Sequence, residues 1–337
     1  MTAGMPIKRI AIIGTRGHWG AVARELESMP SLELVALCEG GDTIAPLTKW
    51  CAENQRTPVV VADHRVMLDQ VRPDMVVVCG PFEQHAQMCI DAIERGVHVL
   101  TEKPAALNFE DLDRLRQACQ HRPQVHLAGM MFSRYTPGFY TAWRLIRGDK
   151  AIGEVRLIEA RKSYRLGERP AYYRDRATYG GTIPWVGSHA IDWVMWFANA
   201  KFESVAATHS TAHNAGNGTM ERSAACQFTM EDGAIASVSI DVFRPPTAPS
   251  HRDDWVRVVG TEGVLEVRPQ SLTLTNPTSD GSSPVQVACD RTALHDFIDH
   301  IEGKSRSLID TQSTLDLTDA CLRARQAADE RRMVAFT

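Results

Sequence analysis

The sequence has no cysteine pair at metal-site spacing, no membrane-length apolar run and no excess of basic residues. Its eight cysteines are scattered without a CxxC pair, which favours reduced thiols in a cytoplasmic protein and predicts no metal site. No apolar run approaches the roughly 18 residues that a membrane-spanning helix needs. The formal net charge of -4 gives no electrostatic reason to expect nucleic acid or a membrane as a partner. A small molecule is therefore the expected partner.

The stretch from Arg9 to Gly20, RIAIIGTRGHWG, carries the first positive signal. It predicts a buried strand, then a turn with Gly14, Gly17 and Gly20, then a helix. Glycines there allow a sharp turn, a close approach to phosphate and tight packing of the helix on the strand. Because the start of a helix attracts anions, the turn predicts a pyrophosphate site. The alternative is a purely structural turn, since three glycines alone are weak evidence.

Glu39 supports the nucleotide interpretation. It ends a second predicted strand, Leu32 to Cys38, about 20 residues past the turn, where an acid binds the adenosine ribose hydroxyls. The next three residues include no arginine or lysine that could receive a 2′-phosphate. The pattern therefore favours NAD over NADP, with an ordinary solvated acid at a strand end as the alternative.

Strand-like and helix-like runs alternate through residues 1–130. This alternation predicts a doubly wound parallel sheet, a Rossmann domain of the α/β class. Ligands of such sheets bind beyond the carboxyl ends of the strands. Gly14, Glu39, Gly80 and Lys103 each follow a predicted strand, so we expect four segments to meet in one crevice.

Residues 131–337 are expected to form an α+β domain that binds substrate and mediates oligomerisation. Long β-rich runs at 154–164, 204–213 and 223–242 predict a large, mostly antiparallel open sheet. An open apolar face would favour a homodimer or homotetramer. The closing helices expected at 293–302 and 311–330 are assigned to this domain.

Two motifs together resemble the Gfo/Idh/MocA family of NAD(P)-dependent oxidoreductases. Residues 85–104, HAQMCIDAIERGVHVLTEKP, match a family pattern of a histidine opening a helix, a glycine, a strand and Glu-Lys-Pro. Residues 180–193, GGTIPWVGSHAIDW, match a glycine pair followed by G-x-H-x-x-D. The resemblance covers essentially the whole chain. The cofactor-binding residues that it implies, together with the turn, are Gly14, Thr15, Arg16, Gly17, His18, Trp19, Glu39, Cys79, Gly80, Pro81, His85, Glu102 and Lys103.

The resemblance implies two catalytic residues. Lys103 would stabilise the substrate oxygen during hydride transfer, and His189 would be the acid/base. Many family members carry an aspartate four residues before the histidine, but this chain has Trp185 there. An indole cannot accept a proton, so His189 acts without that acid, another group replaces it, or Trp185 forms a stacking wall for a sugar ring.

Five residues are candidates for substrate contact: Arg134, Tyr173, Arg174, Trp185 and Asp192. Asp192 lies three residues after His189, on the same helical face. We interpret it mainly as a structural residue that orients His189. The stretch 161–176 holds six basic residues against two acids, with tyrosines between them. It is either a loop that lines a polyhydroxylated or anionic substrate, or a solvated or subunit-facing segment.

Three functions compete. The first is an NAD-dependent dehydrogenase acting on a secondary hydroxyl of a sugar, inositol or related polyol. The second is a glycosidase or lyase that oxidises its substrate transiently and returns the hydride. The third is a sensor or regulator that binds NAD without catalysis, which the tryptophan at position 185 favours and the retained Lys103 and His189 oppose.

Overall fold

The computed structural model describes residues 6–41, 43–279 and 281–336, which form two compact units. The first unit combines the chain up to Met130 with Arg291–Thr318. The second combines Met131–Asp290 with the chain from Asp319 onward. No helix among the described residues is long and apolar enough to cross a membrane.

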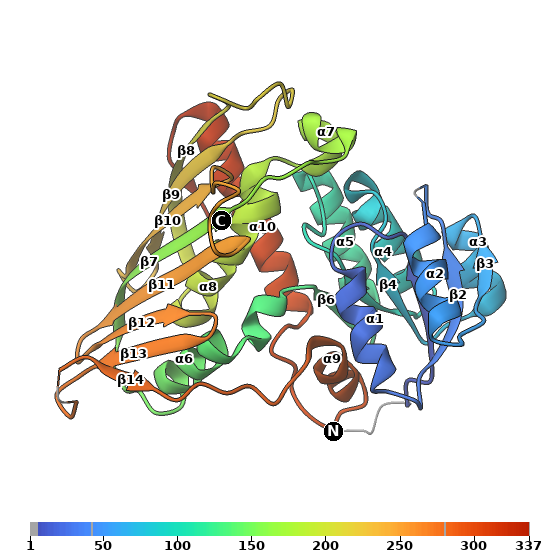
Figure 1. The fold of residues 1–337 in the computed structure, drawn as a ribbon, viewed down its shortest axis with the longest axis horizontal. Coiled ribbons are helices and arrows are strands. Elements are labelled where there is room, and N and C mark those ends of the chain that lie inside the picture. The colour runs from blue at the N-terminus through green and yellow to red at the C-terminus, as the bar shows by residue number, and fades with distance from the viewer. Residues whose placement is uncertain (1–5, 42, 280, 337) are drawn as a thin grey trace. The chain divides into compact units, whose positions relative to one another are not determined.

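The first unit contains a six-stranded sheet in the order β3-β2-β1-β4-β5-β6, and each neighbouring pair is parallel (Figure 1). Its strands are β1 (Arg9–Ile13), β2 (Glu33–Cys38), β3 (Val59–Val61), β4 (Met75–Val78), β5 (His98–Thr101) and β6 (Leu127–Gly129). The central strands β1 and β4 are buried almost throughout, as expected of strands covered on both faces. The predicted Rossmann sheet is confirmed, and its strand order reverses between β1 and β4.

Helices connect these strands in sequence. They are α1 (Trp19–Glu27), α2 (Ala45–Glu53), α3 (His64–Val71), the short η1 (Phe82–Gln84), α4 (His85–Glu94) and α5 (Phe109–His121). The predicted cap of α5 is confirmed, because the Asn108 side chain accepts a hydrogen bond from the Asp111 backbone N–H at 2.8 Å.

The segment Arg291–Thr318 packs within the first unit, although residues 131–337 were expected to form the second domain throughout. It contains α9 (Ala293–Ile301), which packs against α1, and the start of α10 (Thr311–Glu330) (Figure 1). The hydroxyls of Thr311 and Thr314 accept hydrogen bonds from the backbone N–H groups of Leu127 and Gly129 at 3.0 and 2.9 Å. Because β6 is an edge strand, the threonines satisfy N–H groups that have no neighbouring strand on that side.

The second unit contains a nine-stranded sheet in the order β14-β13-β12-β11-β7-β10-β9-β8-β15. Its strands are β7 (Val155–Tyr164), β8 (Phe202–Ser210), β9 (Ser223–Met230), β10 (Ile235–Asp241), β11 (Arg252–Gly260), β12 (Val264–Arg268), β13 (Ser271–Thr275), β14 (Ser283–Val285) and β15 (Val334–Ala335). The central pair β7–β10 is parallel and the other neighbouring pairs are antiparallel, which confirms the mostly antiparallel prediction.

Short helical segments and two longer helices accompany this sheet. They are η2 (Phe132–Tyr135), α6 (Pro137–Arg147), η3 (Ala171–Arg174), α7 (Arg176–Tyr179), η4 (Ile183–Gly187) and α8 (Ser188–Ala198). The π-helical η4 continues directly into α8, which packs on β7 and β10. A π-helical turn is uncommon and is often found at functional sites.

Three histidines of the first unit are in ring contact: His98 stacks on His126, and His126 meets His300 edge to face. The ring centroids of His98 and His126 are 5.5 Å apart, and those of His126 and His300 are 4.6 Å apart. Burial lowers the pKa of His98 from 6.5 to about 4, and the charge of a protonated His126 would lower it further. His98 is therefore neutral in the folded protein at neutral pH.

Because the pKa of His98 is lowered in this cluster, we expect the free energy of unfolding to fall in mild acid. Between pH 6.5 and about 4 the unfolded chain protonates His98 while the folded chain does not, so the free energy of unfolding falls as pH falls. Replacing His98 with asparagine, whose side-chain oxygen can still accept from the His126 N–H, should reduce this slope by up to about 1.4 kcal/mol per pH unit. Denaturant unfolding of both proteins across this range measures the slopes, and equal slopes would contradict the prediction.

Candidate functional site

The turn after β1 is built for close backbone approach. Gly14 and Gly17 have φ angles of +70° and +68°. A Cβ on Gly14 would lie 2.5 Å from the Cys79 carbonyl oxygen, and a Cβ on Gly17 would lie 2.5 Å from Cδ of Glu102. The turn therefore lies directly against the ends of β4 and β5.

Gly20 behaves differently from these two glycines. It is part of α1, and a Cβ there would have Arg24 at 3.9 Å as its nearest neighbour. Of the three glycines, Gly20 is therefore not the one that lets the helix pack tightly on the strand, because the space beside it is open.

The remaining turn residues tie the loop to its surroundings. The Arg16 backbone N–H donates to the Cys79 carbonyl at 2.7 Å, and the Thr15 hydroxyl donates to the Thr43 carbonyl at 2.6 Å. The Arg16 guanidinium lies over the Phe82 ring, 5.9 Å from its centroid. No side chain among the described residues caps the start of α1 at Trp19. The start of a helix favours an anion, although the Ala21 N–H already donates to the His18 carbonyl at 2.8 Å.

Glu39 follows β2 and is exposed, with its backbone N–H donating to the Val61 carbonyl. An exposed carboxylate at this strand end can accept hydrogen bonds from a ribose. The sequence placed Gly14, Glu39, Gly80 and Lys103 at strand ends, and the sheet places all four at the carboxyl ends of β1, β2, β4 and β5.

A buried carboxylate lies beside Lys103. Glu102 is 2% exposed and accepts from Nδ1 of His18 at 2.9 Å. Burial alone would raise the pKa of Glu102, but His18, Lys103 and His85 together lower it below its usual range. The Lys103 side chain is 7% exposed, and its peptide bond to Pro104 is cis. A charged network therefore holds the end of β5 next to the glycine turn.

His85 is fully buried and joins two strand ends. Its Nδ1 lies 2.9 Å from the Pro104 carbonyl and its Nε2 lies 3.0 Å from the Gly80 carbonyl. Burial lowers the pKa of His85, although both carbonyls favour its protonated form. The geometry fixes the segment after Lys103 relative to the Gly80-Pro81 turn, and direct contact of His85 with a cofactor stays a prediction.

In the second unit, His189 occupies the first turn of α8 and is half-buried. Trp185 lies one helical turn earlier, in η4, and is 5% exposed. Its ring contacts Tyr173, with centroids 4.4 Å apart. Arg174 is exposed in the same short helix as Tyr173. Trp185 and Tyr173 are each only 5% exposed, so their rings do not present a broad stacking surface for a sugar.

Glu221 is a site-supporting residue that the sequence did not reveal. Its carboxylate is 2% exposed and accepts from the Tyr179 hydroxyl at 2.7 Å and from the Thr182 N–H at 3.0 Å. The Thr182 hydroxyl donates to the Glu221 carbonyl at 2.7 Å. These bonds anchor the glycine pair 180–181, whose φ angles are +87° and +98°, just before η4. No sequence signal marks Glu221, because its partners lie about 40 residues earlier.

Arg134 and Asp192 form a buried ion pair within the second unit. They are 4% and 0% exposed, and Nε of Arg134 lies 3.0 Å from Oδ2 of Asp192. Burial raises the pKa of Asp192 and Arg134 opposes that shift, so the ionised carboxylate depends on its partner. The pair ties α8 to η2, and contact of either residue with substrate stays a prediction.

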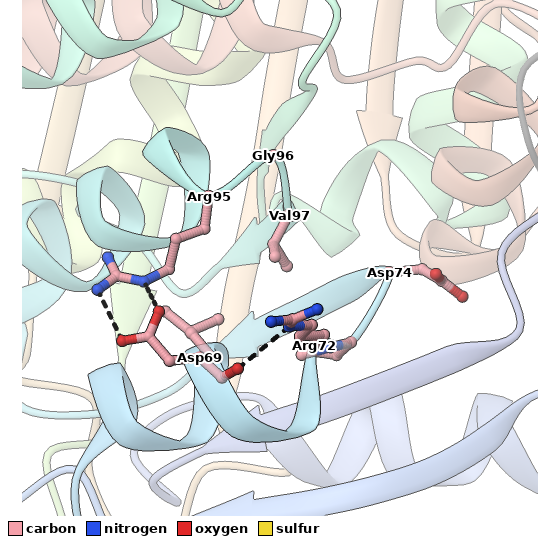
Figure 2. A pocket seen from close by; sticks show the side chains of 8 residues that line it. Asp69, Arg72, Asp74, Arg95, Gly96 and Val97 are labelled. Atoms are coloured by element: carbon pink, nitrogen blue, oxygen red, sulfur yellow. Dashed lines mark hydrogen bonds and ion pairs between the residues drawn. The ribbon is translucent and has the colours of Figure 1, made fainter.

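A cavity of about 370 Å³ lies elsewhere in the first unit (Figure 2). Its lining comes from residues that precede β4 and β5: Leu68, Asp69, Arg72, Pro73, Asp74, Arg95, Gly96 and Val97. Nε of Arg95 pairs with Asp69 at 2.7 Å. The cavity contains none of the predicted site residues and lies at the amino ends of the strands, opposite the glycine turn. No group of three His, Cys, Asp or Glu side chains in the described parts of the chain could hold a metal ion.

Comparison with known proteins supports the nucleotide-binding interpretation of the first unit. Residues 8–129 match the oxidoreductase family with an NAD-binding Rossmann fold, and residues 139–266 match the GFO/IDH/MocA C-terminal domain. A solved structure from Thermotoga maritima, described as an oxidoreductase, is 36% identical. It has a TM-score of 0.92, with 97% of this chain and 100% of that chain covered.

Curated relatives are more distant. One is a 2,7-anhydro-N-acetylneuraminate hydratase from Mediterraneibacter gnavus, 28% identical over 59% of this chain and 51% of the relative. Another is a D-glucoside 3-dehydrogenase from Escherichia coli, 28% identical over 56% of this chain and 53% of the relative. The chain thus spans about half the length of these curated relatives. The two domain matches and the Thermotoga structure nevertheless show that the chain belongs to the Gfo/Idh/MocA family of oxidoreductases.

Proposed function

We propose that the protein transfers a hydride between NAD and a secondary hydroxyl or ketone carbon of a sugar, inositol or related polyol. The observation that carries this proposal is the glycine turn at the point where strand order reverses between β1 and β4. Gly14 and Gly17 leave no room for a Cβ, and Glu39 is exposed at the neighbouring strand end. Together they fit a pyrophosphate and an adenosine ribose.

Bound NAD would supply the hydride acceptor at its nicotinamide ring. His189 would take the proton of the substrate hydroxyl on its imidazole as the hydride leaves the carbon. The Lys103 ammonium would donate a hydrogen bond to the oxygen that becomes negative in the transition state. The Glu102–His18 pair would hold the segment that carries Lys103. Tyr173, Arg174 and Trp185 are the proposed substrate-side residues.

A second candidate uses the same residues without net redox change. Trp185 removes a proton acceptor that many family members have, and one relative is a hydratase. Oxidation, elimination or addition, and return of the hydride would then occur in one cycle. Absorbance of accumulated NADH separates the two candidates, since only net oxidation with added NAD builds it up.

Cofactor binding tests the proposal directly. We expect calorimetric titration to show tighter binding of NADH than of NADPH, because the Glu39 carboxylate would repel a 2′-phosphate. A Glu39→Ser variant should narrow that preference by about tenfold, which corresponds to about 1.4 kcal/mol. Glu33→Ser is the matched control, since Glu33 is also exposed, at the other end of β2.

Two results would count against this assignment. If neither NADH nor NADPH binds, in protein shown to carry no retained cofactor, the oxidoreductase proposal is rejected and a regulator is favoured. An unchanged cofactor ratio in Glu39→Ser would remove Glu39 from the ribose site.

A further inference from the structure

Arg169 lies among aromatic rings in the second unit. Its guanidinium carbon is 5.2 Å from the ring centroid of Trp185, 5.3 Å from that of Tyr164 and 5.7 Å from that of Tyr173. The side chain is half-buried, and its Nε is buried without a hydrogen-bond partner. No carboxylate among the described residues forms an ion pair with it. Ring faces therefore hold this cation, while its Nε–H has no acceptor among the described residues.

A second cation, Arg165, lies close by and is held by carbonyl oxygens. The Arg165 guanidinium donates to the carbonyl oxygens of Ala248 and Ser250, and no ion pair joins it to a described acid. The pKa of His251 reflects this surplus of positive charge. Burial lowers its pKa, and Arg169, Arg165 and other nearby cations lower it further.

Nearby cations on strands β7 and β11 are neutralised by acidic partners. Lys162 lies 2.6 Å from Asp254, which also lies 3.4 Å from Arg252. Arg161 offers the sharpest contrast with Arg169. It lies over the Trp255 ring at 5.4 Å, yet its Nη2 pairs with Asp253 at 2.9 Å. Stacking on an aromatic ring thus does not prevent an arginine here from having a carboxylate partner.

We propose that Arg169 binds the anionic group of the substrate, so that the substrate is a sugar carrying a carboxylate or a phosphate. A guanidinium offers a planar pair of N–H donors that match either group, and stacked rings fix its orientation in advance. Trp185 places Arg169 beside the η4–α8 segment, one helical turn before His189. This inference rests on the proposed function, since it assigns the substrate class of that reaction.

Matched pairs of sugars test the inference. The probes are D-glucuronate and D-galacturonate against their neutral methyl esters, and D-glucose 6-phosphate against D-glucose. Each is titrated by calorimetry into protein with and without NADH. We expect at least one acid to bind roughly 10- to 100-fold tighter than its neutral partner, an advantage that added salt weakens. Tighter binding of a uronate than of its methyl ester indicates a carboxylate site, and tighter binding of glucose 6-phosphate than of glucose indicates a phosphate site.

Three variants show whether Arg169 is responsible. Arg169→Gln should lose the preference for the acid, and Arg169→Lys should keep part of it because the charge remains over the rings. Arg161→Gln is the matched control and should keep the full preference, since the charge it removes is paired with Asp253. Thermal melting of each variant confirms that it is folded.

Equal binding of acid and neutral partner in every pair would overturn the inference, as would a full preference in Arg169→Gln. Neither result would affect the hydride-transfer proposal if NADH still binds. Conversely, failure to bind NADH would reject the proposed function, while the acid–neutral comparison without NADH would still decide the role of Arg169.

Discussion

A Lys103→Ala variant is expected to lose turnover by about 100- to 1,000-fold while its Kd for NADH changes less than about threefold. Lys103 follows β5 at the carboxyl edge of the sheet and is 7% exposed, next to Glu102 and the glycine turn. Its proposed partner is the substrate oxygen, whose negative charge develops only in the transition state. Screening sugars and polyols for NADH formation identifies a substrate. Steady-state kinetics on that substrate give kcat, and calorimetry gives the Kd for NADH.

The cofactor titration also controls for a structural effect. Lys103 helps to lower the pKa of Glu102, so its removal could disturb the pair between Glu102 and His18. Unchanged NADH binding would show that the turn is intact. Lys49→Ala is the comparison for loss of a lysine from the first unit, because Lys49 is 77% exposed and pairs only weakly with Glu53 at 3.8 Å. Near-normal turnover in Lys103→Ala would remove this residue from the mechanism.

An Asp192→Ala variant is expected to lose about 3–5 kcal/mol of unfolding free energy. The substitution would leave the Arg134 guanidinium buried without its carboxylate, in a place where both groups are less than 5% exposed. A buried unpaired charge costs far more than the net contribution of the pair itself. Denaturant unfolding followed by tryptophan fluorescence measures the loss, since Trp193 and Trp196 lie on the same helix.

A double variant separates pairing from packing. Arg134→Met combined with Asp192→Leu removes both charges and keeps apolar volume, so it should be more stable than Asp192→Ala. If the loss of unfolding free energy in the double variant equals the sum of the losses in Arg134→Met and Asp192→Leu made singly, the two residues are not energetically coupled. If activity survives in the double variant, the Asp192 carboxylate is not needed to orient His189.

The first unit could be predicted in most of its detail because its signals are local. Parallel strands buried on both faces are continuous apolar runs, and each is followed within a few residues by its glycine, acid or lysine. Gly14, Glu39, Gly80 and Lys103 therefore lie where the strand pattern placed them. The Asn108 cap was predictable for the same reason, since its hydrogen-bond partner is three residues away.

Contacts between residues far apart in the chain could not be predicted from the sequence. The hydroxyls of Thr311 and Thr314 bind the edge strand β6 from more than 180 residues away, and nothing in their own sequence distinguishes them from second-domain residues. Glu221 similarly anchors the glycine pair from the loop before β9. The spacing of the three glycines could not say which of them has which role, and only the open space around Gly20 shows that it needs no packing role.

The sequence by itself determined the family, the Rossmann sheet, the glycine turn and the candidate catalytic pair, because these follow from residue order and short-range periodicity. The tertiary structure decided which charges are neutralised. It paired Arg134 with Asp192 and Arg161 with Asp253, and left Arg169 among aromatic rings with no acidic partner in the described parts of the chain. Charge pairing depends on distances of a few ångströms between residues far apart in the chain, so composition could show the basic stretch 161–176 but not which of its cations is available to a ligand.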